Sequence, residues 1–217
     1  MIGFYPWLFL LLLFNLLWFF TYALIIRRGE IDRVPGVPLF ALTLNLAWDV
    51  SGAFIVQSPL IQHYIDIGFV IVNVAITIQW FRYWRNDFTR ISAFEFYFFW
   101  ALAQTISFFV ILLGNIELDD VLLYKMGFVD NFINSALFIG MLYQRSALQG
   151  QSIYIGISKL LATGSMSLAM YLMPFPGLED SVITIPLYVG IVLLDVIYVV
   201  AYYAKARRLG IDPWRRW

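Results

Sequence analysis

Long apolar stretches alternate with short polar segments along the whole chain. Seven such stretches can be drawn, and each is long enough for a helix to cross the hydrocarbon core of a bilayer, which takes ~20 residues. Because lipid cannot hydrogen-bond an open backbone, a chain with this pattern crosses the membrane as helices. We therefore predict an all-α membrane protein, a seven-transmembrane-helix bundle in one domain over residues 1–217. The predicted spans are 6–26, 38–56, 61–81, 91–113, 121–143, 152–173 and 182–204.

The segments between the spans are polar or carry helix-ending signals. Residues 27–36, which include Glu30 and Asp32, are expected to form a polar connector after the first span. Residues 57–59 (Gln-Ser-Pro) predict a tight turn, and residues 174–177 (Pro-Phe-Pro-Gly) predict the end of the sixth span.

Charged residues are distributed unevenly between the two sides of the predicted membrane. All but two of the 14 lysines and arginines fall on one side. The loops on the opposite side carry Glu117, Asp119, Asp120, Glu179 and Asp180. Loops rich in lysine and arginine stay in the cytoplasm. We therefore expect a multi-pass integral membrane protein with its N-terminus outside and its C-terminus cytoplasmic.

Composition supports the membrane class and removes several kinds of chemistry. Hydrophobic residues make up 62% of the chain and charged residues 13%, against ~25% in soluble domains; the mean hydropathy is +0.80. Cysteine is absent, which excludes disulfides and thiolate nucleophiles, and the single histidine, His63, cannot build a multi-histidine metal site. We expect no metal, no other cofactor and no nucleic-acid partner.

Polar residues recur at helical spacing inside the spans and mark the faces turned away from lipid. Hydrogen bonds between helices are enough to explain many of them. This group includes Asn15, Thr77, Gln104, Thr163 and Ser167.

Two carboxyl groups, Asp49 and Asp195, lie near the middle of their spans and call for another explanation. A charged side chain at that depth costs ~2.5–3.5 kcal/mol on insertion scales. Burial disfavours the charged form of a carboxyl group, and a facing like charge disfavours it further, so a facing pair shares one proton. We expect Asp49 and Asp195 to face each other in the bundle, where one member can act as an acid and the other as a base.

Three other charged residues within the spans are open to a structural explanation. Asp66 and Asp130 lie nearer the outer ends of their helices, where an interfacial position explains them equally well. Lys159, two turns into the sixth span, can extend toward the interface or pair with an acid.

Short motifs in these spans resemble those of the paxilline-type integral-membrane terpene cyclases. Asn45-x-x-Trp48-Asp49 is similar to that family's Asn-x-x-Trp-Glu motif, and Asp195-x-x-Tyr198 to the Asp-x-x-Tyr part of its last helix. Residues 135–146 and 150–153 resemble the end of its fifth span and the start of its sixth. The motifs occur in the family's order over nearly the whole chain.

The resemblance implies an enzyme that cyclises a lipophilic polyprenyl or prenylated-aromatic substrate without a metal. A carboxylic acid protonates an alkene or an epoxide, and the carbocation then closes the rings. By resemblance, Asp49 is the proton donor and Asp195 its partner or a stabiliser of the cation. Position 49 departs from the family, which often has Glu there, and the shorter side chain leaves the choice of substrate open.

Substrate-binding residues are expected among the polar and aromatic side chains of the spans. Aromatic faces attract cations by ~0.5–2 kcal/mol each, and Asp66 is similarly placed to an acid of the family's third span. The predicted binding residues are Asn45, Trp48, Asp66, Trp100, Asn134, Tyr188 and Tyr198. The substrate is expected to enter from the membrane lipid.

Two other classes of membrane protein share parts of this pattern. A small proton-coupled transporter also buries acids in a polar-lined bundle, although carriers often show proline-broken helices at matching positions. Here Pro38, Pro174, Pro176 and Pro186 fall at the ends of spans. A retinal photoreceptor needs a lysine in its last helix, and the lysine inside this bundle, Lys159, lies in the sixth span.

Overall fold

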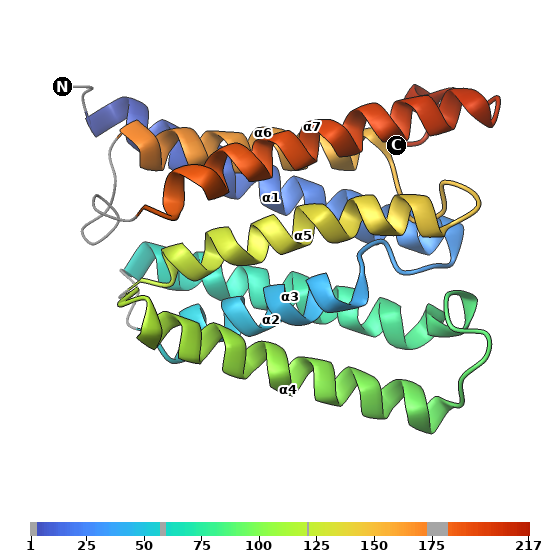
Figure 1. Ribbon diagram of the computed structural model, residues 1–217, viewed down its shortest axis with the longest axis horizontal. Coiled ribbons are helices and arrows are strands. Elements are labelled where there is room, and N and C mark those ends of the chain that lie inside the picture. Colours follow the sequence, from blue (N-terminus) through green and yellow to red (C-terminus); the bar gives the residue numbers. More distant parts are fainter. Residues whose placement is uncertain (1–3, 57–59, 121, 173–181) are drawn as a thin grey trace.

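The computed structural model describes residues 4–56, 60–120, 122–172 and 182–217, and in these ranges the chain forms seven α-helices and no strand (Figure 1). The helices are α1 (Phe4–Asp32), α2 (Leu39–Phe54), α3 (Leu60–Tyr83), α4 (Ala93–Glu117), α5 (Tyr124–Gln144), α6 (Ile153–Leu172) and α7 (Thr184–Arg208). Two 3-10 turns, η1 (Trp84–Asn86) and η2 (Pro213–Arg215), follow α3 and α7. The all-helical prediction is confirmed, with one helix in each predicted span.

Five helices of the described ranges are long and apolar enough to cross a membrane: α1, α3, α4, α6 and α7. Helix α2 is apolar but has only 16 residues. Helix α5 has 21 residues and carries Asp130, Asn131 and Asn134 among its apolar positions. The crossing of the membrane by all seven helices, and their orientation, stay predictions.

Helix α1 is longer than the apolar pattern predicts. Residues 27–32 continue the helix instead of forming a connector, so the predicted boundary at residue 27 is wrong. Arg28 and Asp32, one turn apart, form an ion pair that favours the helical conformation. The helix ends where Arg33 adopts a left-handed backbone conformation, with φ 55°. The polar residues therefore extend α1 beyond the apolar span.

The predicted turn at 57–59 and the proline-rich segment 174–177, with Glu179 and Asp180, lie outside the described residues.

The seven helices form two groups joined along the middle of the molecule. Helices α1, α6 and α7 pack together, and helices α3 and α4 both pack against α2. Helix α5 lies between the groups and contacts both α7 and α2, while α1 contacts α3 (Figure 1). Side chains of six helices can therefore meet in the interior, whereas α4 lies at the edge.

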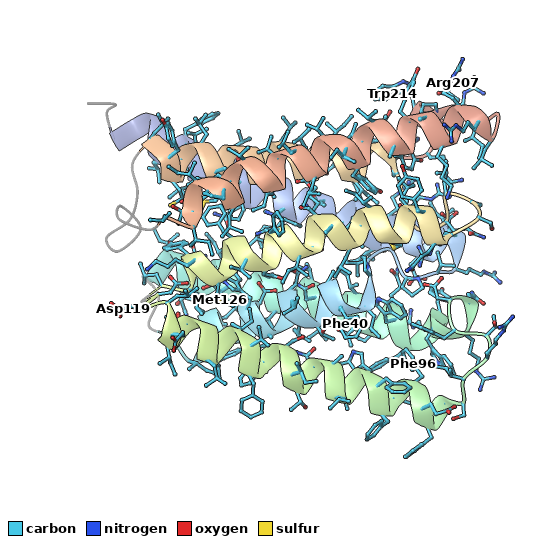
Figure 2. All side chains as sticks on the ribbon, in the orientation of Figure 1. Phe40, Phe96, Asp119, Met126, Arg207 and Trp214 are labelled. Carbon is cyan, nitrogen blue, oxygen red and sulfur yellow. The ribbon has the colours of Figure 1, made fainter. Side chains whose placement is uncertain are left out.

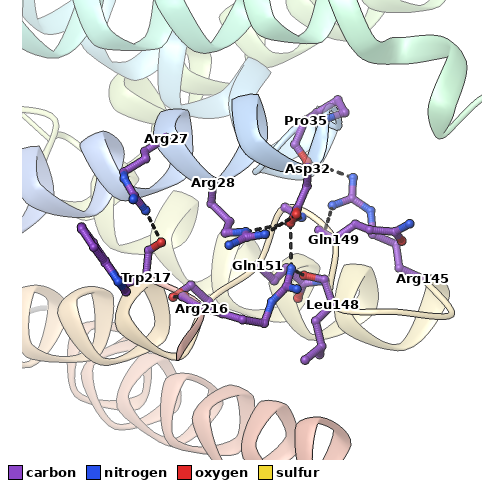
Figure 3. Close-up of polar contacts among 12 residues, drawn as sticks. Arg27, Arg28, Asp32, Pro35, Arg145, Leu148, Gln149, Gln151, Arg216 and Trp217 are labelled. Carbon is purple, nitrogen blue, oxygen red and sulfur yellow. Dashed lines mark hydrogen bonds and ion pairs between the residues drawn. The ribbon is translucent and has the colours of Figure 1, made fainter. Parts of the chain in front are cut away.

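Successive helices run in opposite directions, so their connections alternate between the two ends (Figure 1). Asp119 lies at one end, and Arg207 and Trp214 lie at the other (Figure 2). At the second end Asp32 accepts hydrogen bonds from Arg28, from Arg216 and from the backbone N–H of Gly150 (Figure 3). These bonds join α1, the α5–α6 connection and the segment after α7, and we call this the basic end.

Candidate active site

A cavity of about 80 Å³ lies inside the bundle and is lined by residues of every helix except α4. We call it the central cavity. Two carboxyl groups, those of Asp49 and Asp130, lie in its wall. Aromatic rings from four helices make up much of the rest: Trp18, Tyr22, Trp48, Phe69 and Phe128. The cavity therefore combines acids with aromatic faces.

Asp49 belongs to α2, and its residue is 3% exposed. The Nδ2 atom of Asn73, on α3, donates a hydrogen bond of 2.5 Å to Asp49 Oδ2. Asn45 lies one helical turn before Asp49 and lines the same cavity. The hydrogen bond from a neutral amide holds the carboxyl group in place without supplying a positive charge.

Trp48 and Asn45 are held in the wall of the cavity by hydrogen bonds to the α5 side. The indole Nε1 of Trp48 donates to the carbonyl oxygen of Leu123 at 2.8 Å, and Asn134 Nδ2 donates to Asn45 Oδ1 at 2.9 Å. Gly127 faces the same indole, and a Cβ atom there would lie 3.0 Å from Trp48 Nε1. The absence of a side chain at Gly127 lets α5 approach the ring closely.

Three aromatic rings pack in sequence along one side of the cavity. The ring centroids of Trp18 and Tyr22 are 5.3 Å apart, and those of Tyr22 and Phe69 are 6.0 Å apart in an edge-on arrangement. Packing against each other fixes the rings, so the faces that line the cavity are preorganised. Such faces attract a cation by ~2 kcal/mol or more where water is excluded.

Asp195 lies behind the wall of the cavity rather than in it. Its Oδ1 atom accepts a hydrogen bond from Lys159 Nζ at 2.6 Å, and its Oδ2 atom accepts one from Thr163 Oγ1 at 2.8 Å. Lys159 also donates to Ser135. We expected Asp195 to face Asp49. The structure pairs Asp195 with Lys159 instead, and Thr163 stands between this ion pair and the cavity it lines.

Asp130 is a cavity residue that the sequence analysis did not include among the predicted site residues. It lies on α5, is 5% exposed and shares the wall with Asp49. The spacing of Asp130 and Asn134, four residues apart and therefore on one helix face, is the signal that could have found it. An interfacial position explained the same residue at the level of sequence, because depth along a helix does not give the direction of a side chain.

The other predicted binding residues lie outside the wall of the central cavity. Asn134 donates a hydrogen bond to Asn45, which lines the wall. The ring of Tyr188 packs against the ring of Phe128, another wall residue, with their centroids 4.5 Å apart. Asp66 accepts a hydrogen bond from Gln62, a residue of the wall. Tyr198 packs edge-on against Phe138 near the basic end and bonds Gln151, while Trp100 packs against Phe81 and lines a surface groove beside α2.

A second cavity is larger, about 830 Å³, and lies at the basic end. Its lining includes Asp32, Arg85 and Asp87, together with Arg145, which pairs with Asp87. Its charged lining at the end of the bundle contrasts with the aromatic lining of the central cavity. Within the described ranges, no group of three or more Asp, Glu or His side chains could hold a metal ion.

Comparison with known proteins decides the family. The sequence model of the Pyr4-like transmembrane terpene cyclases matches residues 6–208. The chain belongs to this family. It is therefore a terpene cyclase, an enzyme, and a multi-pass integral membrane protein.

Two terpene cyclases of fungi illustrate the similarity. Terpene cyclase esdpB of Penicillium shearii is 27% identical over 201 residues, covering 88% of this chain and 81% of the relative. Terpene cyclase cle7 of Aspergillus versicolor is 26% identical over 204 residues, covering 88% and 83%. No solved structure gives a significant match.

Proposed function

We propose that this terpene cyclase starts its reaction by protonation, with Asp49 as the proton donor and a lipophilic polyprenyl or prenylated-aromatic chain as the substrate. The observation that carries the proposal is the position of Asp49: a nearly fully buried carboxyl group in the wall of an aromatic-lined cavity. Burial without a positively charged partner favours the neutral acid, which is the form that can give a proton.

The hydrogen bond from Asn73 supports this role for Asp49. It occupies Oδ2, so the proton to be transferred resides on Oδ1. Transfer breaks the O–H bond of the acid. The proton forms a C–H bond at the expense of the π bond of a terminal alkene, or an O–H bond on an epoxide, whose C–O bond then breaks. The remaining double bonds of the chain then attack the cation in turn and close the rings, while Trp18, Tyr22 and Phe69 present their faces to the charge.

Asp195 has a supporting role in this proposal. Lys159 Nζ lies 5.9 Å from the centroid of the Trp18 ring, on the same aromatic wall that would meet the cation. An unneutralised ammonium group at that distance would repel a carbocation. Asp195 cancels the charge of Lys159 and orients Thr163 at the wall. Asp195 is therefore a positioning residue: it lies behind the cavity wall and acts through Lys159 and Thr163 rather than on the substrate.

The size of the cavity sets a condition on substrate binding. Its volume of about 80 Å³ is below the ~300–1,000 Å³ of sites that enclose a drug-sized ligand. The reacting end of the substrate fits inside, and the remainder extends outward or separates the helices. Entry from the bilayer requires no aqueous channel. In this proposal all seven helices cross the membrane with the basic end in the cytoplasm.

The decisive experiment uses purified protein in detergent, with a chelator present. A farnesylated phenol and its terminal epoxide serve as probes, and products are separated and identified by mass spectrometry and NMR. We expect a cyclic isomer of one probe from the wild type. Asp49→Asn should reduce the rate by at least ~10²–10⁴-fold, the range for a general acid, with unchanged helical content.

Asp119→Asn is the matched control, because Asp119 is an exposed acid at the end of the bundle. It should keep the full rate. Full activity in a correctly folded Asp49→Asn variant would remove Asp49 as the donor. Uptake of a solute by proteoliposomes, together with no cyclisation of any probe, would favour the proton-coupled carrier instead.

A further inference from the structure

The central cavity contains a second carboxyl group, which the proposed proton donation does not use. Asp130 comes from α5, and α5 packs against the helix that carries Asp49. The residue is 5% exposed, so its carboxyl group has no ready exchange with bulk water. Both acids line one cavity of about 80 Å³, and a substrate that reaches one of them lies near the other.

The hydrogen bonds of Asp130 differ from those of the other buried acids. Its Oδ1 atom is buried and accepts no hydrogen bond from any residue in the described part of the chain. Both oxygens of Asp195 are occupied, by Lys159 and Thr163, and Oδ2 of Asp49 is occupied by Asn73. A buried carboxyl oxygen without a donor costs ~1–3 kcal/mol or more. Such an atom remains available to take up a proton from a bound molecule.

The two acids also share one small cavity of low dielectric. Two carboxyl groups in such a site share a proton rather than both ionising. With the shared proton on Asp49, the Oδ1 atom of Asp130, which has no hydrogen-bond donor in the described part of the chain, is available to accept a proton.

Resting on the proposed function, we propose that Asp130 is the base of the central cavity: it removes a proton from the final cation and so ends the cyclisation. After the last ring closes, a C–H bond next to the cationic carbon breaks, its electron pair forms a double bond, and the proton forms an O–H bond on Asp130. Transfer of this proton from Asp130 to the Asp49 carboxylate restores the starting state. The substrate is isomerised, and the cycle requires no oxidant, reductant or second substrate.

The test compares Asp130→Asn and Asp130→Glu with the wild type, using whichever probe the wild type converts. In Asp130→Asn the acid that starts the reaction is intact, but the base is missing. We expect the terminal proton to leave from other positions, or water to capture the cation. The product then changes from one cyclic alkene to a mixture of alkene isomers and alcohols, and the steady-state rate falls by ~10²–10⁴-fold.

Asp130→Glu separates a chemical role from a structural one. Glutamate restores the carboxylate but adds a methylene to a packed interior, so a structural role predicts that it does no better than asparagine. We expect Asp130→Glu to give the wild-type product as the main product at a reduced rate. This comparison also decides the case in which Asp130→Asn yields too little folded protein or too little product to analyse.

Two results would overturn the assignment of Asp130. One is an unchanged product ratio in folded Asp130→Asn; the other is failure of Asp130→Glu to restore the wild-type product. Neither result touches the proposed function, which stands or falls on Asp49→Asn. Conversely, full activity in the Asp49→Asn variant would contradict the assignment of Asp49 as proton donor, whatever the Asp130 variants show.

Discussion

Two buried acids of this terpene cyclase, Asp49 and Asp195, lie in the middle of their helices and are buried to almost the same extent, at 3% and 2% exposure. Their surroundings differ in charge. Asp195 bonds an ammonium group and a hydroxyl group, whereas Asp49 bonds an amide and shares its cavity with a second acid. The first arrangement stabilises a carboxylate, and the second favours a neutral acid. In the proposed mechanism, therefore, burial alone does not distinguish the proton donor from its supporting acid; the charge of the partner does.

The comparison gives the two regions different expected responses to mutation. Around Asp195, a substitution should act first on stability, because it leaves the Lys159 charge buried without a partner. In the central cavity, a substitution should act on rate or on product while stability is kept. The following predictions test this difference, from the largest expected effect on product formation to the smallest.

Asp195→Asn should lower the free energy of unfolding by about 3–5 kcal/mol, since it breaks a buried ion pair and keeps one charge. Thermal unfolding in detergent, followed by circular dichroism, measures the loss. The double variant Asp195→Leu with Lys159→Met should recover wild-type stability, because replacing a buried pair with apolar groups is often neutral or stabilising. It should also recover product formation. An Asp195→Asn variant with wild-type stability and no activity would instead place Asp195 in the chemistry.

Gly127→Ala should affect the cavity with little change in stability. The added Cβ atom would lie 3.0 Å from Trp48 Nε1, and the hydrogen bond to Leu123 limits how far this ring can move. Overpacking costs ~1–3 kcal/mol, while alanine gains ~1 kcal/mol over glycine in a helix. We expect a roughly tenfold loss of rate or a changed product ratio, measured with the converted probe.

Gly164→Ala is the matched control for Gly127→Ala, because a Cβ atom at Gly164 meets nothing within 4 Å. It should keep the rate and product of the wild type and raise the unfolding temperature slightly. Equal behaviour of the two alanine variants would show that the position of the Trp48 ring does not matter to the reaction.

Ser92→Ala should give the smallest effect on the reaction, because Ser92 lies at the start of α4, the helix that contributes nothing to the wall of the central cavity. Ser92 and Glu95 form a capping box at its start, with Ser92 accepting from Glu95 N and Glu95 accepting from Ser92 N. Loss of such a cap costs ~0.5–2 kcal/mol. The unfolding temperature should fall modestly while rate and product stay unchanged. A changed product would contradict the separation of α4 from the reaction.

Much of the fold could be predicted from the sequence because apolar length and backbone hydrogen bonding leave few alternatives. Each predicted span corresponds to one helix, although the pattern placed the end of α1 too early. Hydropathy reports where a helix leaves the apolar layer, and the ion pair of Arg28 with Asp32 continues the helix beyond that point. The sequence also located Asp49, with Asn45 and Trp48, because a lone charge in an apolar run is conspicuous.

The composition of the cavity could not be predicted in the same way. Trp100 and Asp130 show the difficulty: the predicted aromatic residue lies at a surface groove, and the omitted acid lines the cavity. Which side of a helix faces the interior depends on its rotation about its own axis, and helices that are apolar all round give little indication of it.

The sequence by itself determined that this protein is a helical membrane protein with an acid inside its second apolar stretch, because the cost of exposing backbone and charge to lipid constrains any chain of this composition. The tertiary structure decided which acids share a cavity and which is neutralised. That outcome depends on contacts between helices far apart in sequence, where one lysine on α6 gives Asp195 a partner and leaves Asp49 and Asp130 together.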